Sequence, residues 1–172
     1  MHLVFHSSLS IMQTTYQIKR SHTLWHRSHY TIQDGEKICY QISKSDLEKH
    51  RSFEDVNKQV RYQIGKKTLR SMNGQILAEI ASNGKSIRTI HGNYFLTDID
   101  LAQGNYTLKL HDQIIAQVQK KRLFTGERTT IELVNINEQQ LEFLFALLIL
   151  IDSYYQTIRN PLYYLPVPYR PL

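Results

Sequence analysis

Basic side chains are the groups in this sequence with the clearest capacity for chemistry. One cluster is Gln119-Lys120-Lys121-Arg122, and a second consists of Lys66, Lys67 and Arg70. Lys and Arg donate charge-assisted hydrogen bonds to phosphate oxygens, so either cluster could bind an anionic ligand. The alternative is that both clusters are solvated strand ends. The candidate ligand-binding residues are therefore Lys66, Lys67, Arg70, Lys120, Lys121 and Arg122.

Histidines are the second group with chemical potential, because His22, His26 and His29 lie close together in HTLWHRSH. On a helix the three would share one face and could ligate a metal ion. On a strand His22 and His26 share a face and His29 lies opposite. Neither a cysteine nor a carboxylate stands near enough in the sequence to complete a ligand set. We therefore expect no metal and no cofactor.

Candidates for catalysis are few. Asp98 and Asp100 in LTDIDL could work as an acid and a base, but carboxylates two residues apart are common in turns. The single cysteine, Cys39, could be a nucleophile, although on a strand we expect a small buried apolar residue. The familiar glycine-rich phosphate loops, HExxH and the nucleophile elbow do not occur. The sequence indicates a protein that is not an enzyme.

Composition and charge limit the class of protein. The chain has 172 residues, of which 41% are hydrophobic and 21% charged, as in one globular domain. Its net charge of +6 favours anionic partners, although many proteins carry such an excess without an anionic ligand. MHLVFHSSLSIM lacks the features of a signal peptide and is interpreted as the first strand or two. With one thiol and no signal peptide, the expected location is the cytoplasm, with peripheral contact to the membrane left open.

Alternation of apolar and polar residues predicts strands over most of the chain. Hairpins are predicted at 30–42, 68–80 and 106–118, with turns at Asp34-Gly35, Asn73-Gly74 and His111-Asp112. These segments share one scheme at a spacing of roughly forty residues, which indicates a repeated unit; three independent hairpins are the alternative. Further strands are expected near 10–20, 59–65, 85–91, 93–99 and 128–135. The charged segment 44–58 shows little alternation and predicts a short helix or an exposed loop.

The C-terminal stretch EQQLEFLFALLILIDSYYQ, residues 138–156, is apolar on every side of the helix that it predicts. Asn137 is the expected N-cap, with Gln140 three residues later as in a capping box. Because Glu142 and Asp152 interrupt the run, it is short for a membrane span and predicts a buried helix of about 138–157. Ten to twelve strands closed into a barrel would need such a helix, since a barrel of that width cannot be filled by its own side chains.

Taken together, the hairpins of the form Y-x-I-x-D-G-x-x-I, the basic patch and the apolar helix ending in Ile-Asp resemble the tubby C-terminal-like superfamily. The likeness is strongest to its LURP-one-related and small bacterial members, and YTLKLHDQIIAQVQKKRLFTGERTTIELVNINEQQLEFLFALLILID (106–152) carries most of it. The resemblance implies a closed barrel of about twelve antiparallel strands around a central hydrophobic helix. It also implies a role at lipid surfaces, because relatives include phosphoinositide-binding domains and phospholipid scramblases. The tubby phosphoinositide motif cannot be matched residue by residue.

These observations predict a single barrel domain over 1–159 and a Pro/Tyr-rich tail over 160–172. The leading hypothesis is a non-enzymatic barrel that binds an anionic ligand or a membrane phospholipid surface. The alternative is a protein-interaction module that acts through the tail. Nucleic acid is a less favoured partner, because the sequence shows no groove-reading element.

Overall fold

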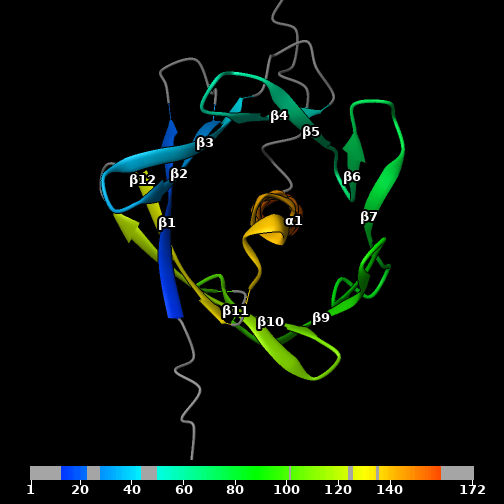
Figure 1. The fold of residues 1–172 in the computed structure, drawn as a ribbon. Coiled ribbons are helices and arrows are strands. Elements are labelled where there is room, and N and C mark those ends of the chain that lie inside the picture. The colour runs from blue at the N-terminus through cyan, green and yellow to red at the C-terminus, as the bar shows by residue number, and fades with distance from the viewer. Residues whose placement is uncertain are drawn as a thin grey trace, which may run out of the picture.

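The described part of the chain is a closed β-barrel with a helix along its axis (Figure 1). The computed structural model describes residues 13–22, 28–43, 50–100, 102–123, 126–134 and 136–159. The elements are β1 (Gln13–His22), β2 (Ser28–Asp34), β3 (Lys37–Ser43), β4 (Arg51–Asp55), β5 (Val60–Ile64), β6 (Thr68–Ser71), β7 (Ile76–Ile80), β8 (Ser86–Thr89), β9 (Gly92–Asp100), β10 (Asn105–Leu110), β11 (Gln113–Leu123), β12 (Gly126–Val134) and α1 (Glu138–Arg159).

Each strand pairs with its neighbours in sequence, and the ring closes where β1 pairs antiparallel with β12. The register of this closure runs from Gln13 opposite Val134 to Arg20 opposite Glu127. Closure leaves the sheet without a free edge, which removes the template for edge-to-edge aggregation. The predicted mainly β fold, a twelve-stranded antiparallel barrel around the C-terminal helix, is confirmed.

The three hairpins predicted to repeat, β2–β3, β6–β7 and β10–β11, have the same irregularity. In each, the pairing shifts by one residue directly after a fully buried side chain, that of Ile32, Leu69 or Leu108. The β4–β5 hairpin has the same shift, directly after the fully buried Phe53, so the bulge also occurs outside the predicted repeat. The repeated unit therefore stays a prediction, with independent hairpins as its alternative.

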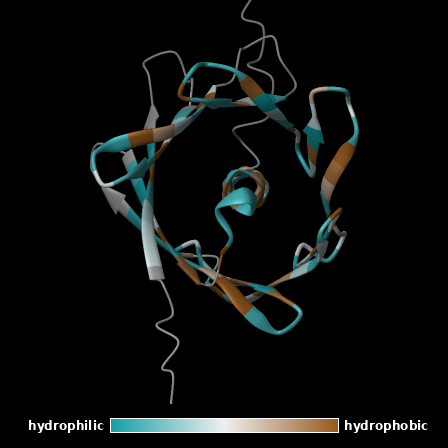
Figure 2. Ribbon diagram, viewed as in Figure 1, coloured by the Kyte–Doolittle hydropathy of each residue, from teal (hydrophilic) through white to brown (hydrophobic). Residues whose placement is uncertain are grey.

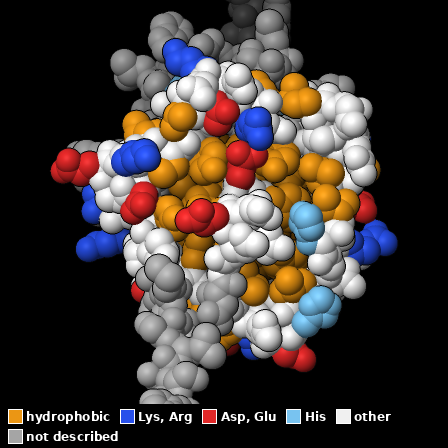
Figure 3. All heavy atoms as spheres, in the orientation of Figure 1, with side chains coloured by type: hydrophobic (Ala, Val, Ile, Leu, Met, Phe, Trp, Pro, Cys, Tyr) orange, Lys and Arg blue, Asp and Glu red, His pale blue; other side chains and the backbone are white. Residues whose placement is uncertain are grey.

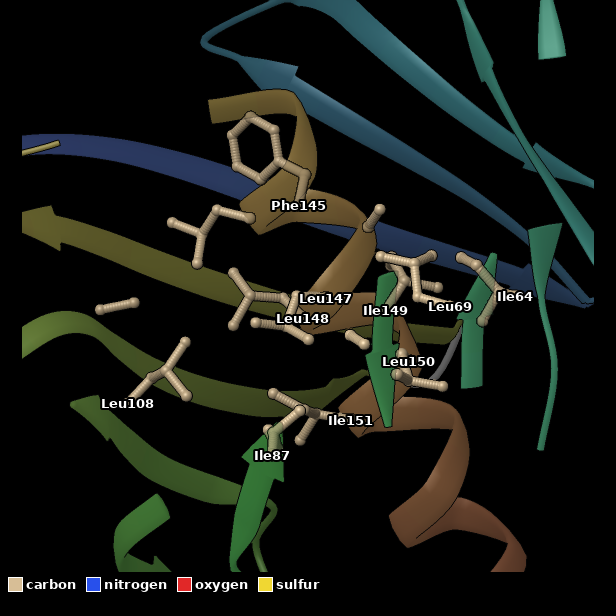
Figure 4. Packing of buried hydrophobic residues seen from close by; sticks show 14 of the residues in the cluster. Ile64, Leu69, Ile87, Leu108, Phe145, Leu147, Leu148, Ile149, Leu150 and Ile151 are labelled. Carbon is tan, nitrogen blue, oxygen red and sulfur yellow. The ribbon is translucent and has the colours of Figure 1, made fainter. Parts of the chain in front are cut away.

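Helix α1 fills the barrel. Asn137 caps it as predicted, since its Oδ1 accepts a hydrogen bond of 3.1 Å from the backbone N–H of Gln139. All side chains from Phe143 to Ile151 are buried, and those on every side of the helix meet inward-facing strand residues. Figure 4 shows Leu147, Leu148 and Ile151 of α1 beside strand residues such as Leu108 and Ile87. Along the strands apolar and polar residues alternate (Figure 2), because only one face of each strand meets the helix.

The same helix is long and apolar enough to cross a membrane by length and composition, but 67% of its apolar window is buried inside the barrel. A helix that is apolar all round needs apolar surroundings, and here the strands supply them. The prediction that the run would be a core helix is confirmed.

Two local predictions were wrong. Residues 51–55 of the segment expected to be helix or loop form β4, because Phe53 packs in the core with no exposed surface while charged neighbours flank it. Five residues are too few for the alternation of apolar and polar side chains to indicate a strand clearly. Cys39 is half-buried rather than buried, and it is the extra residue of the bulge between Ile38 and Tyr40 in β3. The predicted N-terminal strand at 1–12, residues 44–49 and the tail at 160–172 lie outside the described residues.

Candidate functional site: the basic end and the buried ionic cluster

The barrel has two ends of opposite charge. Because the strands are antiparallel and consecutive, alternate turns gather at the same end. The end where α1 begins, called here the acidic end, has the turns β2–β3, β4–β5, β6–β7, β8–β9 and β10–β11. Among the described residues, its charged side chains include Asp34, Glu36, Asp55, Asp112, Glu138 and Glu142, against Lys37, Lys58, Arg61 and Arg70. The other end, called the basic end, carries Arg20, Arg51, Lys66, Lys67, Lys85, Lys120, Lys121 and Arg128, against Asp98, Asp100, Glu127 and Asp152.

This polarity matches the dipole of α1. The N-terminus of a helix has partial positive charge and attracts acidic side chains, whereas its C-terminus attracts cations. Glu138 stands in the first turn of α1, and the side chain of Arg51 reaches Ser153 in its later turns. The two ends of the barrel are therefore electrostatically distinct surfaces.

Three of the predicted ligand-binding residues are exposed at the basic end. Lys66 and Lys67 form the β5–β6 turn, and Lys121 lies near the end of β11. The Nζ atom of Lys67 sits 5.6 Å from the centre of the Tyr154 ring, a cation–π contact with the helix. Lys85, in the β7–β8 turn, is a further exposed cation at this end that the sequence did not single out. Together Lys66, Lys67, Lys85 and Lys121 form what we call the basic rim.

The other predicted residues lie elsewhere. Arg70 is directed to the acidic end, where its guanidinium donates a 3.1 Å hydrogen bond to the carbonyl of Gly74 in the β6–β7 turn. Lys120 points into the barrel, with only 3% of its side chain exposed. The backbone of Arg122 belongs to β11, and its side chain lies outside the described residues. The two sequence clusters thus do not form one continuous patch in the described residues.

Lys120 belongs to a buried ionic cluster where the helix meets five strands, β1, β2, β4, β11 and β12. Its ammonium contacts the carboxylate of Asp152 on α1 and lies 3.3 Å from Oε2 of Glu127 on β12. The same oxygen of Glu127 lies 3.3 Å from Nη1 of Arg20 on β1. These contacts join β1, β11 and β12 to the last third of the helix.

A second branch of the cluster runs through Tyr30 on β2. Its hydroxyl donates to Oδ2 of Asp152 over 3.3 Å and accepts from Nη1 of Arg51 on β4, also over 3.3 Å. Arg51 in turn contacts the hydroxyl of Ser153. The guanidinium groups of Arg20 and Arg51 lie 5.7 and 5.2 Å from the centre of the Tyr30 ring. Tyr30 is therefore held by cations on both sides and by Asp152 at its hydroxyl.

Burial and charge determine the protonation states in this cluster. Burial raises the pKa of Tyr30, and the negative charge of Asp152 raises it further, so the phenol keeps its proton. The pKa of the buried Tyr106 is raised well above its ordinary value by the same two causes. For Glu127 burial acts to raise the pKa, but attraction to Lys120 and then Arg20 outweighs it and lowers the pKa overall. Glu127 is therefore ionised over the physiological range.

This arrangement ties the helix to the strands around its end. The described cluster has three cations, Arg20, Arg51 and Lys120, for two carboxylates, so it adds positive charge beneath the basic end. Two small cavities border Asp152, one lined by Asn105, Tyr106 and Tyr155 and the other mostly by apolar residues such as Ile131 and Leu148. Each has room for little more than a water molecule. The cluster joins the end of the helix to the strands around it.

The remaining sequence candidates have structural roles where they are described. Asp100 caps the β9–β10 turn, since its Oδ1 accepts from the backbone N–H groups of Ala102 and Gln103, both at 3.0 Å. Asp98 accepts a 3.0 Å hydrogen bond from the hydroxyl of Thr97. Among the described residues no group of His, Cys, Asp and Glu could hold a metal ion. His26 and the side chain of His22 lie outside them.

Comparison with protein-family models, with curated proteins and with solved structures finds no match to this chain. The site is therefore interpreted from its own geometry.

Sequence reasoning missed Arg20, Arg51, Glu127 and Asp152 as members of one cluster. A signal for Lys120 was present, since it alternates with Ala116 and Val118, both of which face the helix. Asp152 could be recognised only as the residue that ends the apolar run. Its partners come from strands distant in sequence, and their proximity depends on closure of the ring.

Proposed function

We propose that this protein is a non-enzymatic barrel whose basic end binds an anionic ligand, and in particular a membrane surface that contains acidic phospholipid. The observation that supports this most directly is the basic rim, in which Lys66, Lys67, Lys85 and Lys121 are all exposed. Lysines on short turns can approach a flat array of phosphate groups together, and each contributes about 1 kcal/mol near an anionic bilayer. The resemblance to tubby-like proteins is part of the same proposal.

The ionic cluster strengthens the proposal by adding charge beneath the rim. Fixed positive charge partly shielded from water acts over a longer distance than a mobile surface lysine. The acidic end faces the opposite way along the barrel axis. An anionic surface would therefore orient the molecule with its basic end towards that surface. The binding should weaken as salt is added, because exposed charges are screened.

Co-sedimentation with vesicles tests the proposal. Vesicles with phosphatidylserine should sediment the protein at low salt, whereas neutral phosphatidylcholine vesicles should not. Lys66→Glu/Lys67→Glu should weaken binding at least about tenfold. The matched control is Lys37→Glu/Lys58→Glu, which changes the net charge equally at the acidic end and should leave binding nearly intact. The proposal would be contradicted if the protein bound neither kind of vesicle, or if both double variants lost binding to the same extent.

The alternative, a protein interaction through residues 160–172, remains a prediction. Deletion of this segment should abolish partner binding in that case and leave vesicle binding unchanged.

A further inference from the structure

The side chains of Lys120 and Asp152 meet in a way that allows a covalent bond to form between them, which the proposed function does not require. The Nζ atom of Lys120 contacts Oδ1 of Asp152, and the two side chains are only 3% and 18% exposed. Charged side chains of the acidic end, by contrast, lie on the surface that Figure 3 shows, where water solvates them. An amine and a carboxyl group held in a geometry that favours attack reach an effective concentration of about 10⁵–10⁸ M. Lys120 and Asp152 are therefore placed to condense into an amide.

Hydrogen bonds to the second carboxyl oxygen prepare Asp152 as the electrophile. The hydroxyl of Tyr30 donates to Oδ2 over 3.3 Å, and Nε2 of Gln156, one turn further along α1, donates to the same atom. Burial and then the charge of Asp152 raise the pKa of Tyr30, so its hydroxyl keeps the proton that it donates. When an amine attacks Cγ, negative charge develops on Oδ2, and two donors already directed at that oxygen stabilise it. Oδ1, which contacts Lys120, is then the oxygen that departs.

Glu127 is the group that can carry a proton between the two partners. The Nζ atom of Lys120 donates a hydrogen bond of 3.3 Å to its Oε2, which places a carboxylate beside the attacking nitrogen. Burial acts to raise the pKa of Glu127, but attraction to Lys120 and then Arg20 outweighs it and lowers the pKa overall. The carboxyl group is therefore ionised and can accept a proton. A proton acceptor in contact with the reacting nitrogen is what general base catalysis requires.

We propose that Lys120 and Asp152 condense into an amide bond, with Glu127 as the general base and then the general acid. The ammonium of Lys120 first transfers one proton to Oδ1 of Asp152, which gives a neutral amine and a neutral carboxylic acid. The amine attacks Cγ, the new C–N bond forms, and Glu127 takes a second proton from the nitrogen. Glu127 then returns this proton to Oδ1 as the C–Oδ1 bond breaks, and one water molecule leaves. The third proton stays on the amide nitrogen, so atoms and charges balance without an oxidant, a reductant or another reactant.

The bond closes a covalent loop that runs from β11 through β12 to the last third of α1, so the helix is tied to the ring of strands. A cross-link of this kind stabilises a fold mainly by restricting the unfolded chain, as a disulfide does. Condensation removes one positive and one negative charge together, so the excess positive charge of the cluster does not change. Before the bond forms, the two groups act as the ion pair described above. Failure of the protein to bind acidic vesicles would leave the amide bond in place.

The mass of the full chain, measured under denaturing conditions, tests the proposal. It should be lower than the mass calculated from the sequence by one water molecule. Lys120→Arg keeps the positive charge but removes the amine, so this variant should have its full calculated mass. The matched control is Lys121→Arg, because Lys121 is the exposed neighbour on the same strand, and this variant should still lose one water molecule. Glu127→Gln removes the general base and should form the bond at least about a hundredfold more slowly.

A tryptic digest locates the bond. Trypsin does not cleave after an acylated lysine, so residues 110–121 and 129–159 of the unmodified protein should remain joined in one branched peptide. Circular dichroism shows which variants are folded, and the mass and digest of the unmodified chain decide the question even where a variant does not fold. An unmodified chain of full calculated mass overturns the proposal. So does a loss of water that persists in Lys120→Arg, because that loss would come from another site, such as ring closure at Asp34-Gly35.

Discussion

The ammonium of Lys120 and the carboxylate of Asp152 form an ion pair inside the barrel, between β11 and the last third of α1. The pair joins the two features that define this fold, the ring of strands and the helix within it. Packing against the strands holds the helix along its length, and a specific polar contact adds a preference for one position and rotation. The pair between Lys120 and Asp152, extended by Glu127 and Tyr30, favours one position of the helix.

Removal of either partner should destabilise the protein strongly. Lys120→Met leaves two carboxylates without their shared cation in a partly buried site, so the free energy of unfolding should fall by about 3–5 kcal/mol. The double variant with Asp152→Asn should lose less than the sum of the two single losses, because the residues are coupled. Urea unfolding measures all three.

The neighbouring lysine provides the control for this experiment. Lys121 lies beside Lys120 on the same strand and is exposed, so Lys121→Met should change the free energy of unfolding by no more than about 0.5 kcal/mol. Equal losses for Lys120→Met and Lys121→Met would show that the buried pair does not hold the helix.

The pH dependence of stability should report on Glu127. Burial alone would raise the pKa of this carboxyl, but the charges of Lys120 and Arg20 lower it below the unfolded value. A group with a lowered folded pKa contributes stability above its unfolded pKa, about 4.3 for Glu, and loses it as the pH falls through the folded pKa. The stability difference between the unmodified protein and Glu127→Gln should therefore be constant from about pH 7 to pH 5 and shrink below about pH 4.

Urea unfolding at a series of pH values measures this difference. Glu79→Gln is the comparison, because Glu79 pairs with Arg88 over 3.1 Å at a largely exposed site where solvent screens the interaction. Its stability difference should be small at every pH. A Glu127→Gln difference that grows towards low pH would have the wrong sign and would exclude the proposed charge balance.

Alternation and the apolar run were enough to predict a ring of strands around the helix, although they missed β4. Ile42, Ile80 and Val118 face the helix in equivalent hairpins, and the sequence shows them at equivalent places after each turn. Local chemistry also predicted the N-cap at Asn137, because the cap depends only on residues next to it. These features are determined by short stretches of sequence.

The ionic cluster could not be predicted in the same way. Arg20 and Glu127 are brought together by the pairing of β1 with β12, the first and last strands of the ring. In the sequence Lys120 and its exposed neighbour Lys121 look alike. Neighbouring strand residues point to opposite faces of the sheet, so the two lysines can be told apart only when it is known which face of β11 points into the barrel. Arg70 was grouped with Lys66 and Lys67 because it is near them in sequence, but its side chain reaches the turn at the opposite end of the barrel.

Two truncations on the same helix test whether α1 is held by the barrel along its length. Leu147 has no exposed surface and lies among strand residues, so Leu147→Ala should lower the free energy of unfolding by about 2–5 kcal/mol through lost burial and the cavity left behind. Ile158→Ala, in the last turn, removes a similar side chain that is already 53% exposed and should cost less than about 1 kcal/mol. Chemical unfolding of the two variants in parallel gives the comparison. Equal, small losses would mean that the strands do not enclose the middle of the helix, and the barrel would then lack the core that its width requires.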